Sequence, residues 1–318
     1  MGYIFIFFGL FVLINIYFKI ADTYNIIDKP NHRSAHTEIT IRGGGIIFWF
    51  SAIIISVQYF QELKWFLLGI TLMSLVSFWD DIQSLPNKIR LIVHFTAITL
   101  AFYSLGLFSI FPIYLIIIAY FLFVGIINAY NFMDGINGIT GLYTLVFFSA
   151  MYWVNQNELI FTISDFLLYP MIASLVFLFY NYRGKAKCFA GDIGSISIAF
   201  WIVYTLVLLM LKTKSFVWML FLSVYGVDTV VTIMHRLYLK ENIFEAHRHH
   251  FYQVLCNEMK ISHKKVSLVY AVVQLLIDMI VIRYEKQIND VMMFFMILLP
   301  LILLYTYKFS LIKKLNLR

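Results

Sequence analysis

Two adjacent carboxylates, Asp80 and Asp81, stand where a long apolar segment ends. Charged side chains at a membrane boundary are costly unless they bind a cation or face water. Neighbouring residues on a helix point about 100° apart, so the two carboxylates would not bind one metal ion equally. The pair therefore predicts divided roles, with one carboxylate near a divalent cation and the other near an attacking group. The structural alternative is a solvated helix end, with Lys88 as the nearby positive charge.

A second polar cluster follows another apolar segment, at residues 128–141. Asn131, Asp134 and Asn137 are spaced by three, so in a helical segment they would share one face. The glycines interleaved with them would let a ligand approach the backbone closely. The cluster is neither a P-loop nor a dinucleotide fingerprint, because it lacks the Gly-Lys-Ser/Thr sequence and the strand context. It predicts a ligand-binding segment, and a glycine-rich helix-packing face is the alternative.

Two further segments carry groups that could hold a phosphate or a metal ion. In the stretch 188–195, Asp192 leads directly into an apolar helix, where an aspartate could also be a simple N-cap. The other segment is a run of three histidines and one arginine: His247, Arg248, His249 and His250. Zinc sites usually space their histidines more widely and add carboxylates, so phosphate recognition is the favoured interpretation of this run.

Arg42 and Asp228 lie in or beside apolar segments, and the sequence allows two interpretations of each. Arg42 is followed by three glycines, which suits a pyrophosphate group and equally suits ordinary anchoring at the membrane boundary. Asp228 lies within an apolar segment and could pair with Arg236 or bond to Thr232 one turn away. Its role is either structural or in support of a site.

The elements that must position these clusters are membrane-spanning helices. Of the 318 residues, 62% are hydrophobic and 13% are charged, whereas soluble proteins carry roughly 25% charged residues. Many apolar runs approach the length of about 20 residues that a helix needs to cross a bilayer. Barrel strands would alternate apolar and polar residues instead. The chain is therefore predicted to be an all-α polytopic membrane protein with a single domain over 1–318.

Eleven spans are predicted, with ten as the alternative because the stretch 91–127 can be divided differently. The first span follows no basic residue and precedes no small-residue cleavage pattern, which predicts an uncleaved helix rather than a signal peptide. The predicted spans are 3–18, 45–60, 63–79, 91–108, 110–127, 139–154, 162–181, 194–211, 215–234, 266–283 and 291–309.

Most of the 24 lysine and arginine residues fall in loops on one face of this arrangement. The positive-inside rule predicts that this face is cytoplasmic, with a periplasmic N-terminus and a cytoplasmic C-terminus in a bacterial inner membrane. All the polar clusters described above except Asp228 share that face. The same bias explains the net charge of +7, so nucleic acid is not expected as a partner. Cys188 and Cys256 fit no zinc or redox spacing.

Carboxylates for a hard cation and basic groups for phosphates thus meet on one membrane face. This combination predicts Mg²⁺-assisted phosphoryl chemistry. A secondary transporter would place its polar residues near mid-membrane and would usually show repeated halves. An intramembrane hydrolase would need the same metal ligands with water as the nucleophile.

In this order the motifs resemble those of the polyprenyl-phosphate N-acetylhexosamine-1-phosphate transferase superfamily, which includes WecA- and MraY-type enzymes. The resemblance runs from about Asp28 to Gln253. It rests on Asp-Asp, on Asn-x-x-Asn-x-x-Asp-Gly-x-Asn-Gly and on Gly-Asp-x-Gly-Ser. It implies transfer of an N-acetylhexosamine 1-phosphate from a UDP-N-acetylhexosamine of the GlcNAc, FucNAc or QuiNAc type to undecaprenyl phosphate in the lipid bilayer, with release of UMP.

The His-Arg-His-His run is more similar to enzymes that initiate O-antigen or other surface polysaccharides than to the peptidoglycan enzyme. A role in lipopolysaccharide or cell-wall biogenesis is therefore expected. An MraY-type phospho-N-acetylmuramoyl-pentapeptide transferase is the alternative within the superfamily. A homodimer is an assembly that the sequence leaves open.

The resemblance also implies roles for single residues. Asp192 would bind Mg²⁺, with Mn²⁺ as the alternative cation, and Asp80 and Asp81 would serve the metal and the lipid phosphate. Asp81 is the second expected metal ligand. The implied catalytic histidines are His247, His249 and His250. The implied substrate-binding residues are Asn131, Asp134, Asn137, Phe189 (stacked on uracil), Lys88, Arg248 and Arg42. The chain departs from the family pattern at Asn137, which replaces an Asp as in many non-MraY members, and after Arg42, where it lacks the proline often seen there.

Overall fold

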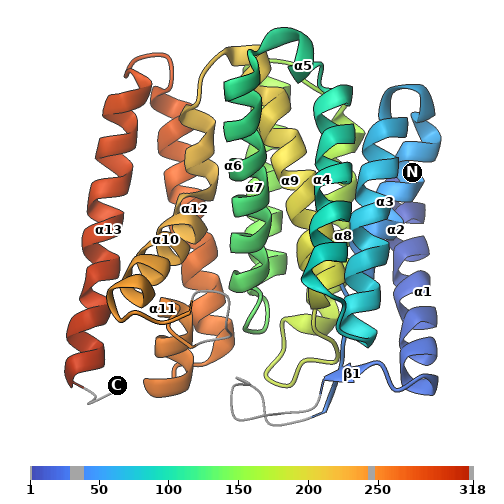
Figure 1. Cartoon of the computed structure of the whole chain (residues 1–318). Coiled ribbons are helices and arrows are strands. Elements are labelled where there is room, and N and C mark those ends of the chain that lie inside the picture. Colours follow the sequence, from blue (N-terminus) through green and yellow to red (C-terminus); the bar gives the residue numbers. More distant parts are fainter. Residues whose placement is uncertain (1, 29–38, 243–247, 315–318) are drawn as a thin grey trace.

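The computed structural model describes residues 2–28, 39–242 and 248–314, and in these ranges the chain is built from helices and one short ribbon of two strands. Most helices are long and run side by side in one bundle (Figure 1). The elements are α1 (Gly2–Thr23), β1 (Ile27–Asp28), β2 (Thr40–Ile41), α2 (Ile46–Gln58), α3 (Phe60–Ile82), α4 (Asn87–Ser104), α5 (Leu107–Ile110), α6 (Ile113–Met133), α7 (Ile139–Asn157), α8 (Ser164–Asn181), α9 (Gly191–Thr213), η1 (Val217–Leu222), α10 (Ser223–Tyr238), α11 (Phe251–Gln253), η2 (Val254–Glu258), α12 (His263–Tyr284) and α13 (Asp290–Lys314).

The all-α membrane fold predicted from the sequence is confirmed. Within the described residues, eight helices are long and apolar enough to cross a membrane. Every predicted span overlaps a helix of the structure; the second span falls on the shorter helix α2, and the ninth falls on η1 and α10 together. The number of eleven crossings and the orientation of the two termini stay predictions.

Helix α9 forms the centre of the bundle. It packs against α2, α3, α6 and α7, and its residues from Ile193 to Leu206 are all buried. A helix that is apolar on every face is expected to lie in the interior. Gly69 of α3 lets the ring of Phe200 approach closely, and the hydroxyls of Ser74 and Ser197 share a hydrogen bond of 2.7 Å between α3 and α9. These contacts fix α9 as the scaffold from which its first turn projects.

Two outer helices, α6 and α13, turn large apolar side chains away from the protein. A soluble protein rarely exposes contiguous apolar surfaces of this size, whereas a membrane protein covers them with lipid. On α6 these side chains include Ile113, Tyr114, Ile117 and Phe121, and on α13 they include Val291, Phe295, Leu299 and Leu303.

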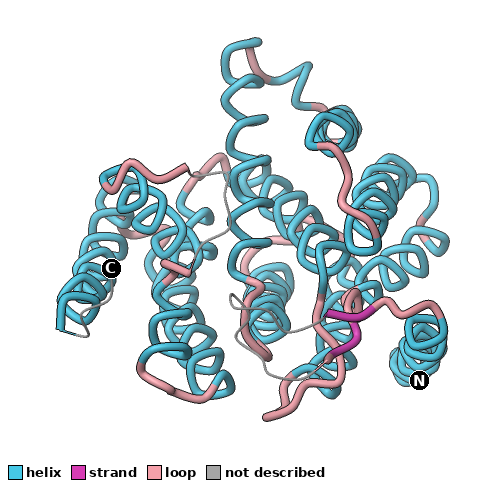
Figure 2. The backbone as a smooth tube through the Cα atoms, turned by 60° about the horizontal axis from the view of Figure 1, so that its bottom comes forward, coloured by secondary structure: helices cyan, strands magenta, loops and turns pink. Residues whose placement is uncertain are grey.

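The polar loops gather at one end of the bundle, which we call the pocket end. There α3, α6 and α8 end and α9 begins, and the β1–β2 ribbon lies beside the N-terminal helix (Figure 2). The ribbon is antiparallel, pairs Ile27 with Ile41, and was not predicted from the sequence. Ile41 also forms an isolated parallel β-bridge with Cys188, so the ribbon links the first loop to the turn before α9.

Candidate active site

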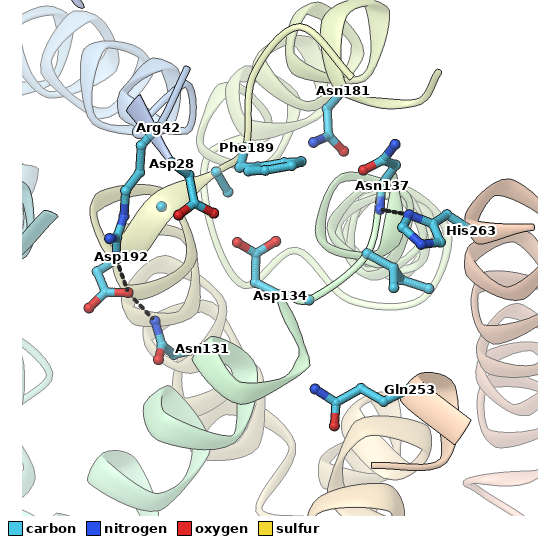
Figure 3. A pocket seen from close by; sticks show the side chains of 14 residues that line it. Asp28, Arg42, Asn131, Asp134, Asn137, Asn181, Phe189, Asp192, Gln253 and His263 are labelled. Carbon is cyan, nitrogen blue, oxygen red and sulfur yellow. Dashed lines mark hydrogen bonds and ion pairs between the residues drawn. The ribbon is translucent and has the colours of Figure 1, made fainter. Parts of the chain in front are cut away.

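A polar cavity of about 270 Å³ opens at the pocket end. It is built by segments from across the chain, namely the ribbon, the end of α6, the end of α8 and the start of α9 (Figure 3). The lining residues are Asp28, Arg42, Asn131, Asp134, Gly135, Ile136, Asn137, Asn181, Phe189, Ala190, Gly191, Asp192, Gln253 and His263. Six of the thirteen predicted site residues therefore meet in one cavity.

Asp192 projects into this cavity from the first turn of α9. Its Oδ1 accepts a hydrogen bond of 3.1 Å from the Nδ2 of Asn131. Two guanidinium groups approach the same carboxylate: Arg42 Nη2 lies 3.9 Å from Oδ1 and Arg90 Nη2 lies 4.0 Å from Oδ2. The carboxylate is thus partly open and surrounded by positive charge.

Asp81 holds the beginning of α9. Its Oδ1 and Oδ2 accept the backbone N–H groups of Asp192 and Ile193 at 2.9 and 3.0 Å. These are among the N–H groups that a helix leaves without partners at its N-terminus. Arg42 Nε lies 2.7 Å from Asp81 Oδ1, and the Asp81 side chain is fully buried. The capping function that the sequence allowed for Asp192 therefore belongs to Asp81, and Asp192 is left to face the cavity.

Asp80 points to a different set of partners, as expected for adjacent positions on a helix. Its Oδ1 accepts the Leu85 N–H at 2.7 Å, and its Oδ2 lies 2.9 Å from Arg90 Nη1. The interpretation of Lys88 as its counter-charge is wrong, because Arg90 takes this place and Lys88 is exposed. Arg90 thus lies between Asp80 and Asp192, so α4 places a cation beside the Asp192 carboxylate.

The side chains of the cavity fit a magnesium ion that is bound partly by the protein and partly by a substrate. Among the described residues, no group of three histidine, cysteine, aspartate or glutamate side chains could hold a metal ion by itself. Mg²⁺ is usually bound by one or two carboxylates together with water and substrate phosphates. Asp192 offers such a carboxylate, whereas both oxygens of Asp81 already accept backbone N–H groups.

The expectation that Asn131, Asp134 and Asn137 share a helix face is wrong. Helix α6 ends at Met133, and the chain turns through Gly138, whose φ is +89°, before α7 begins. All three side chains still line the cavity, Asn131 from the last turn of α6 and Asp134 and Asn137 from the turn that follows (Figure 3).

Asp134 sits in the middle of this turn. Burial, helped by the negative charge of Asp192, raises the pKa of Asp134 to about 6, although a hydrogen bond from the Thr140 hydroxyl lowers it.

Arg42 is oriented by the ribbon and by its glycine run. Burial would lower the pKa of its guanidinium, but the charges of Asp81 and Asp192 raise it above the ordinary value. Gly44 N–H and Gly45 N–H donate to the carbonyls of Phe189 and Ala190 at 2.8 and 3.0 Å. The glycines thus allow the loop to lie directly against the turn before α9, a packing function that neither sequence interpretation included.

Phe189 lies half-buried at the cavity wall, with its ring lining the polar space (Figure 3). An aromatic ring facing a polar cavity offers an apolar face for stacking a planar group.

The described part of the histidine segment, residues 248–250, lies beside the cavity rather than in it. His247 lies outside the described residues. His249 Nε2 pairs with Glu241 at 3.2 Å, and burial lowers the pKa of His249 against the raising effect of Glu241. His250 is only 2% exposed, with its Nδ1 3.3 Å from Asp228. Arg248 is half-buried, and of the described residues in this segment Gln253 alone lines the cavity.

Four lining residues with polar side chains were missed as site residues from the sequence: Asp28, Asn181, Gln253 and His263. Asn181 closes α8, and its amide joins two segments of the cavity wall. Its Oδ1 accepts the Gly138 N–H at 2.6 Å and its Nδ2 donates to the Cys188 carbonyl at 2.8 Å. His263 Nδ1 accepts the Asn137 N–H at 3.4 Å from the start of α12. A single asparagine or histidine at a helix end gives no signal of this kind in the sequence.

Replacing Asn181 by alanine is expected to lower the free energy of unfolding by about 2–6 kcal/mol. The loss leaves the buried Gly138 N–H and Cys188 carbonyl without partners, at a cost of about 1–3 kcal/mol each. Thermal unfolding of the purified protein in detergent measures this effect. Asn157→Ala is the matched control, since Asn157 is exposed and bonds only to Trp153 one turn away. Equal melting temperatures for the two variants would contradict the bridging role of Asn181.

Comparison with known proteins agrees with this geometry. The sequence model of glycosyl transferase family 4 matches residues 63–210, which include Asp80, Asp81 and Asp192. The chain is 25% identical over 308 residues to the undecaprenyl-phosphate alpha-N-acetylglucosaminyl 1-phosphate transferase of Thermotoga maritima, covering 93% of this chain and 94% of that protein. In sequence the chain is similar, over nearly its whole length, to members of the polyprenyl-phosphate N-acetylhexosamine-1-phosphate transferase superfamily.

Other members of the superfamily are similar over shorter stretches. A probable undecaprenyl-phosphate N-acetylglucosaminyl 1-phosphate transferase of Bacillus subtilis is 23% identical over 275 residues, which are 79% of this chain and 75% of that protein. A phospho-N-acetylmuramoyl-pentapeptide-transferase of Dictyoglomus turgidum is 30% identical over 178 residues, or 49% of this chain and 55% of that protein. Both branches of the superfamily named in the sequence analysis therefore occur among the relatives.

Proposed function

We propose that this transferase moves an N-acetylhexosamine 1-phosphate from a UDP-sugar to undecaprenyl phosphate and releases UMP. The observation that carries the proposal is Asp192, a partly open carboxylate flanked by Arg42 and Arg90 in a polar cavity at the end of a membrane bundle. Carboxylate and guanidinium groups at such a boundary suit the meeting of a metal-bound diphosphate with a lipid phosphate.

The donor would lie across the cavity, with its base at the Phe189 ring and its diphosphate toward Asp192. Asp134 and Asn137 would then face the nucleoside. Mg²⁺ held by Asp192 would supply positive charge for the diphosphate. Arg42 and Arg90 would add to that charge, which is needed because two anionic phosphates repel one another strongly beside a low-dielectric membrane.

The reaction would be a direct displacement. An oxygen of the lipid phosphate attacks the β-phosphorus of the UDP-sugar, and the bond from that phosphorus to the bridging oxygen breaks. UMP leaves with the bonding electron pair. A phosphate monoester has a second pKa near 6, so the lipid nucleophile is mostly dianionic at neutral pH and needs little help from a general base.

Asp81 would act on this step indirectly. Because its two oxygens accept N–H groups of α9 and its Oδ1 pairs with Arg42, we assign it the task of holding α9 and Arg42 in place. Asp80 would hold Arg90 in the same way. This differs from the expectation that Asp80 and Asp81 serve the metal and the lipid phosphate directly.

Two finer assignments belong to the same proposal. The N-acetylglucosaminyl relatives make UDP-GlcNAc the first donor to test, ahead of the FucNAc and QuiNAc types. The product would initiate a lipid-linked surface polysaccharide, with the cavity on the cytoplasmic side of the bacterial inner membrane, where UDP-sugars are made.

The test is an assay of purified protein with undecaprenyl phosphate, Mg²⁺ and a panel of UDP-N-acetylhexosamines that includes UDP-N-acetylmuramoyl-pentapeptide. We expect UMP release that needs both the lipid and Mg²⁺, with formation of a sugar-diphospho-lipid. Preference for the pentapeptide donor would identify an MraY-type enzyme instead. Free phosphate or sugar phosphate as the product would identify a hydrolase.

A further inference from the structure

Two oppositely charged side chains, Asp228 of α10 and Lys308 of α13, are fully buried beside the histidine segment. Lys308 Nζ donates to the Thr232 hydroxyl at 3.0 Å. The Thr232 oxygen in turn lies 3.3 Å from Asp228 Oδ1 and 3.4 Å from the His249 carbonyl. The ammonium group of the last helix thus reaches the carboxylate through one shared hydroxyl.

Asp228 holds the segment 249–253 by several bonds. Its Oδ1 accepts the Phe251 N–H at 3.0 Å and lies 3.3 Å from His250 Nδ1, while its Oδ2 accepts the Tyr270 hydroxyl at 2.8 Å. The sequence left open whether Asp228 pairs with Arg236 or bonds to Thr232. The structure shows the bond to Thr232, and Arg236 pairs with Glu241 instead.

The same segment forms part of the cavity wall. Tyr252 donates its hydroxyl to the Phe132 carbonyl at 3.0 Å, just before the turn that carries Asp134. A Cβ placed on Gly135 would lie only 2.1 Å from the Tyr252 hydroxyl, so the two chains are in direct contact. Gln253 lines the cavity itself and accepts the His250 N–H at 3.2 Å.

We propose that Lys308 is a positioning residue, which holds the segment 249–253 against the cavity through Thr232 and Asp228. A buried charge is expensive, and an apolar residue of similar size often packs at least as well in its place. Helix α13 is otherwise largely exposed on its apolar surface, so packing alone gives no reason for an inward ammonium group. The inference rests on the proposed function, because it assigns the segment to donor binding.

Lys308→Met tests this role, since it keeps the length of the side chain and removes the charge. We expect the KM for the UDP-sugar to rise about 10- to 100-fold, by analogy with the partners that orient metal-binding histidines. The KM for undecaprenyl phosphate should stay unchanged. A loss of folded molecules would lower the maximal rate at constant KM, so the rise in donor KM is a readout that a purely structural lysine would not give.

Two further variants separate positioning from charge balance. Thr306→Val changes a lipid-exposed residue of the same helix and should behave as the wild type. The double variant Asp228→Asn/Lys308→Met leaves no unpaired charge. We expect it to regain folded yield but to keep the high donor KM, because an amide has one acceptor oxygen where the carboxylate used two for Phe251, His250 and Tyr270.

Hydrogen exchange of the segment gives an answer that does not depend on catalysis. In Lys308→Met the amides of Phe251 and Tyr252 should exchange faster than in the wild type. Unchanged exchange together with an unchanged donor KM would overturn the inference, and so would a lower melting temperature at constant KM. Faster exchange in a protein without transfer activity would support the positioning role and refute the proposed function alone.

Discussion

Asp192→Asn is expected to lower the maximal rate of sugar-1-phosphate transfer on the order of a thousandfold. A metal ion that neutralises charge in a transition state contributes several kcal/mol, and each 1.4 kcal/mol, roughly, corresponds to a factor of ten in rate. The asparagine removes the negative charge from the cavity, while its amide oxygen can still accept the hydrogen bond from Asn131. The fold should therefore be retained and the loss should lie in catalysis.

The experiment measures UMP release at saturating donor and lipid over a series of Mg²⁺ concentrations. Asp22→Asn is a suitable control, because Asp22 is an exposed carboxylate at the end of α1 and does not line the cavity. A chelator should abolish the activity of the wild type and of the control, and should change little in Asp192→Asn. Near-normal, Mg²⁺-dependent turnover in Asp192→Asn would refute the assignment of this carboxylate.

Gly45→Ala is expected to damage both stability and activity. The added Cβ would lie 2.3 Å from the Gly194 Cα and 2.9 Å from the Ala190 carbonyl oxygen. Both neighbours are backbone atoms, so the loop and the first turn of α9 would have to move apart. Overpacking of this kind typically costs about 1–3 kcal/mol, and here it would also displace Asp192.

Thermal unfolding in detergent and UMP release from the same preparation measure the two effects. Gly125→Ala is the matched control, because Gly125 lies within α6 and a Cβ there would meet no atom within 4 Å. Alanine in a helix interior is favoured over glycine by about 1 kcal/mol, so this control should melt at the same temperature or higher. If Gly45→Ala also melts at the wild-type temperature with full activity, the close contact between the loop and α9 is not required.

The sequence by itself determined the membrane bundle and the end at which its chemistry lies. Hydropathy is a local property, so each apolar run could be assigned to a helix without knowledge of its neighbours. The spacing of Asp80, Asp134 and Asp192 relative to those runs was enough to predict that they gather at one end. The cavity confirms this for Asp134 and Asp192, and the Arg90 bridge connects Asp80 to them.

Only the tertiary structure decided which carboxylate does what. Asp81 and Asp192 are 111 residues apart, and the sequence cannot show that one caps the helix from which the other projects. The same is true of Asn181 between two turns, and of Lys308, which meets Thr232 across 76 residues. The prediction that Asn131, Asp134 and Asn137 share a helix face was wrong, because α6 ends at Met133 and the chain turns through Gly138. Apolar patterns fix each helix separately, whereas the roles of buried polar groups depend on which helices pack together.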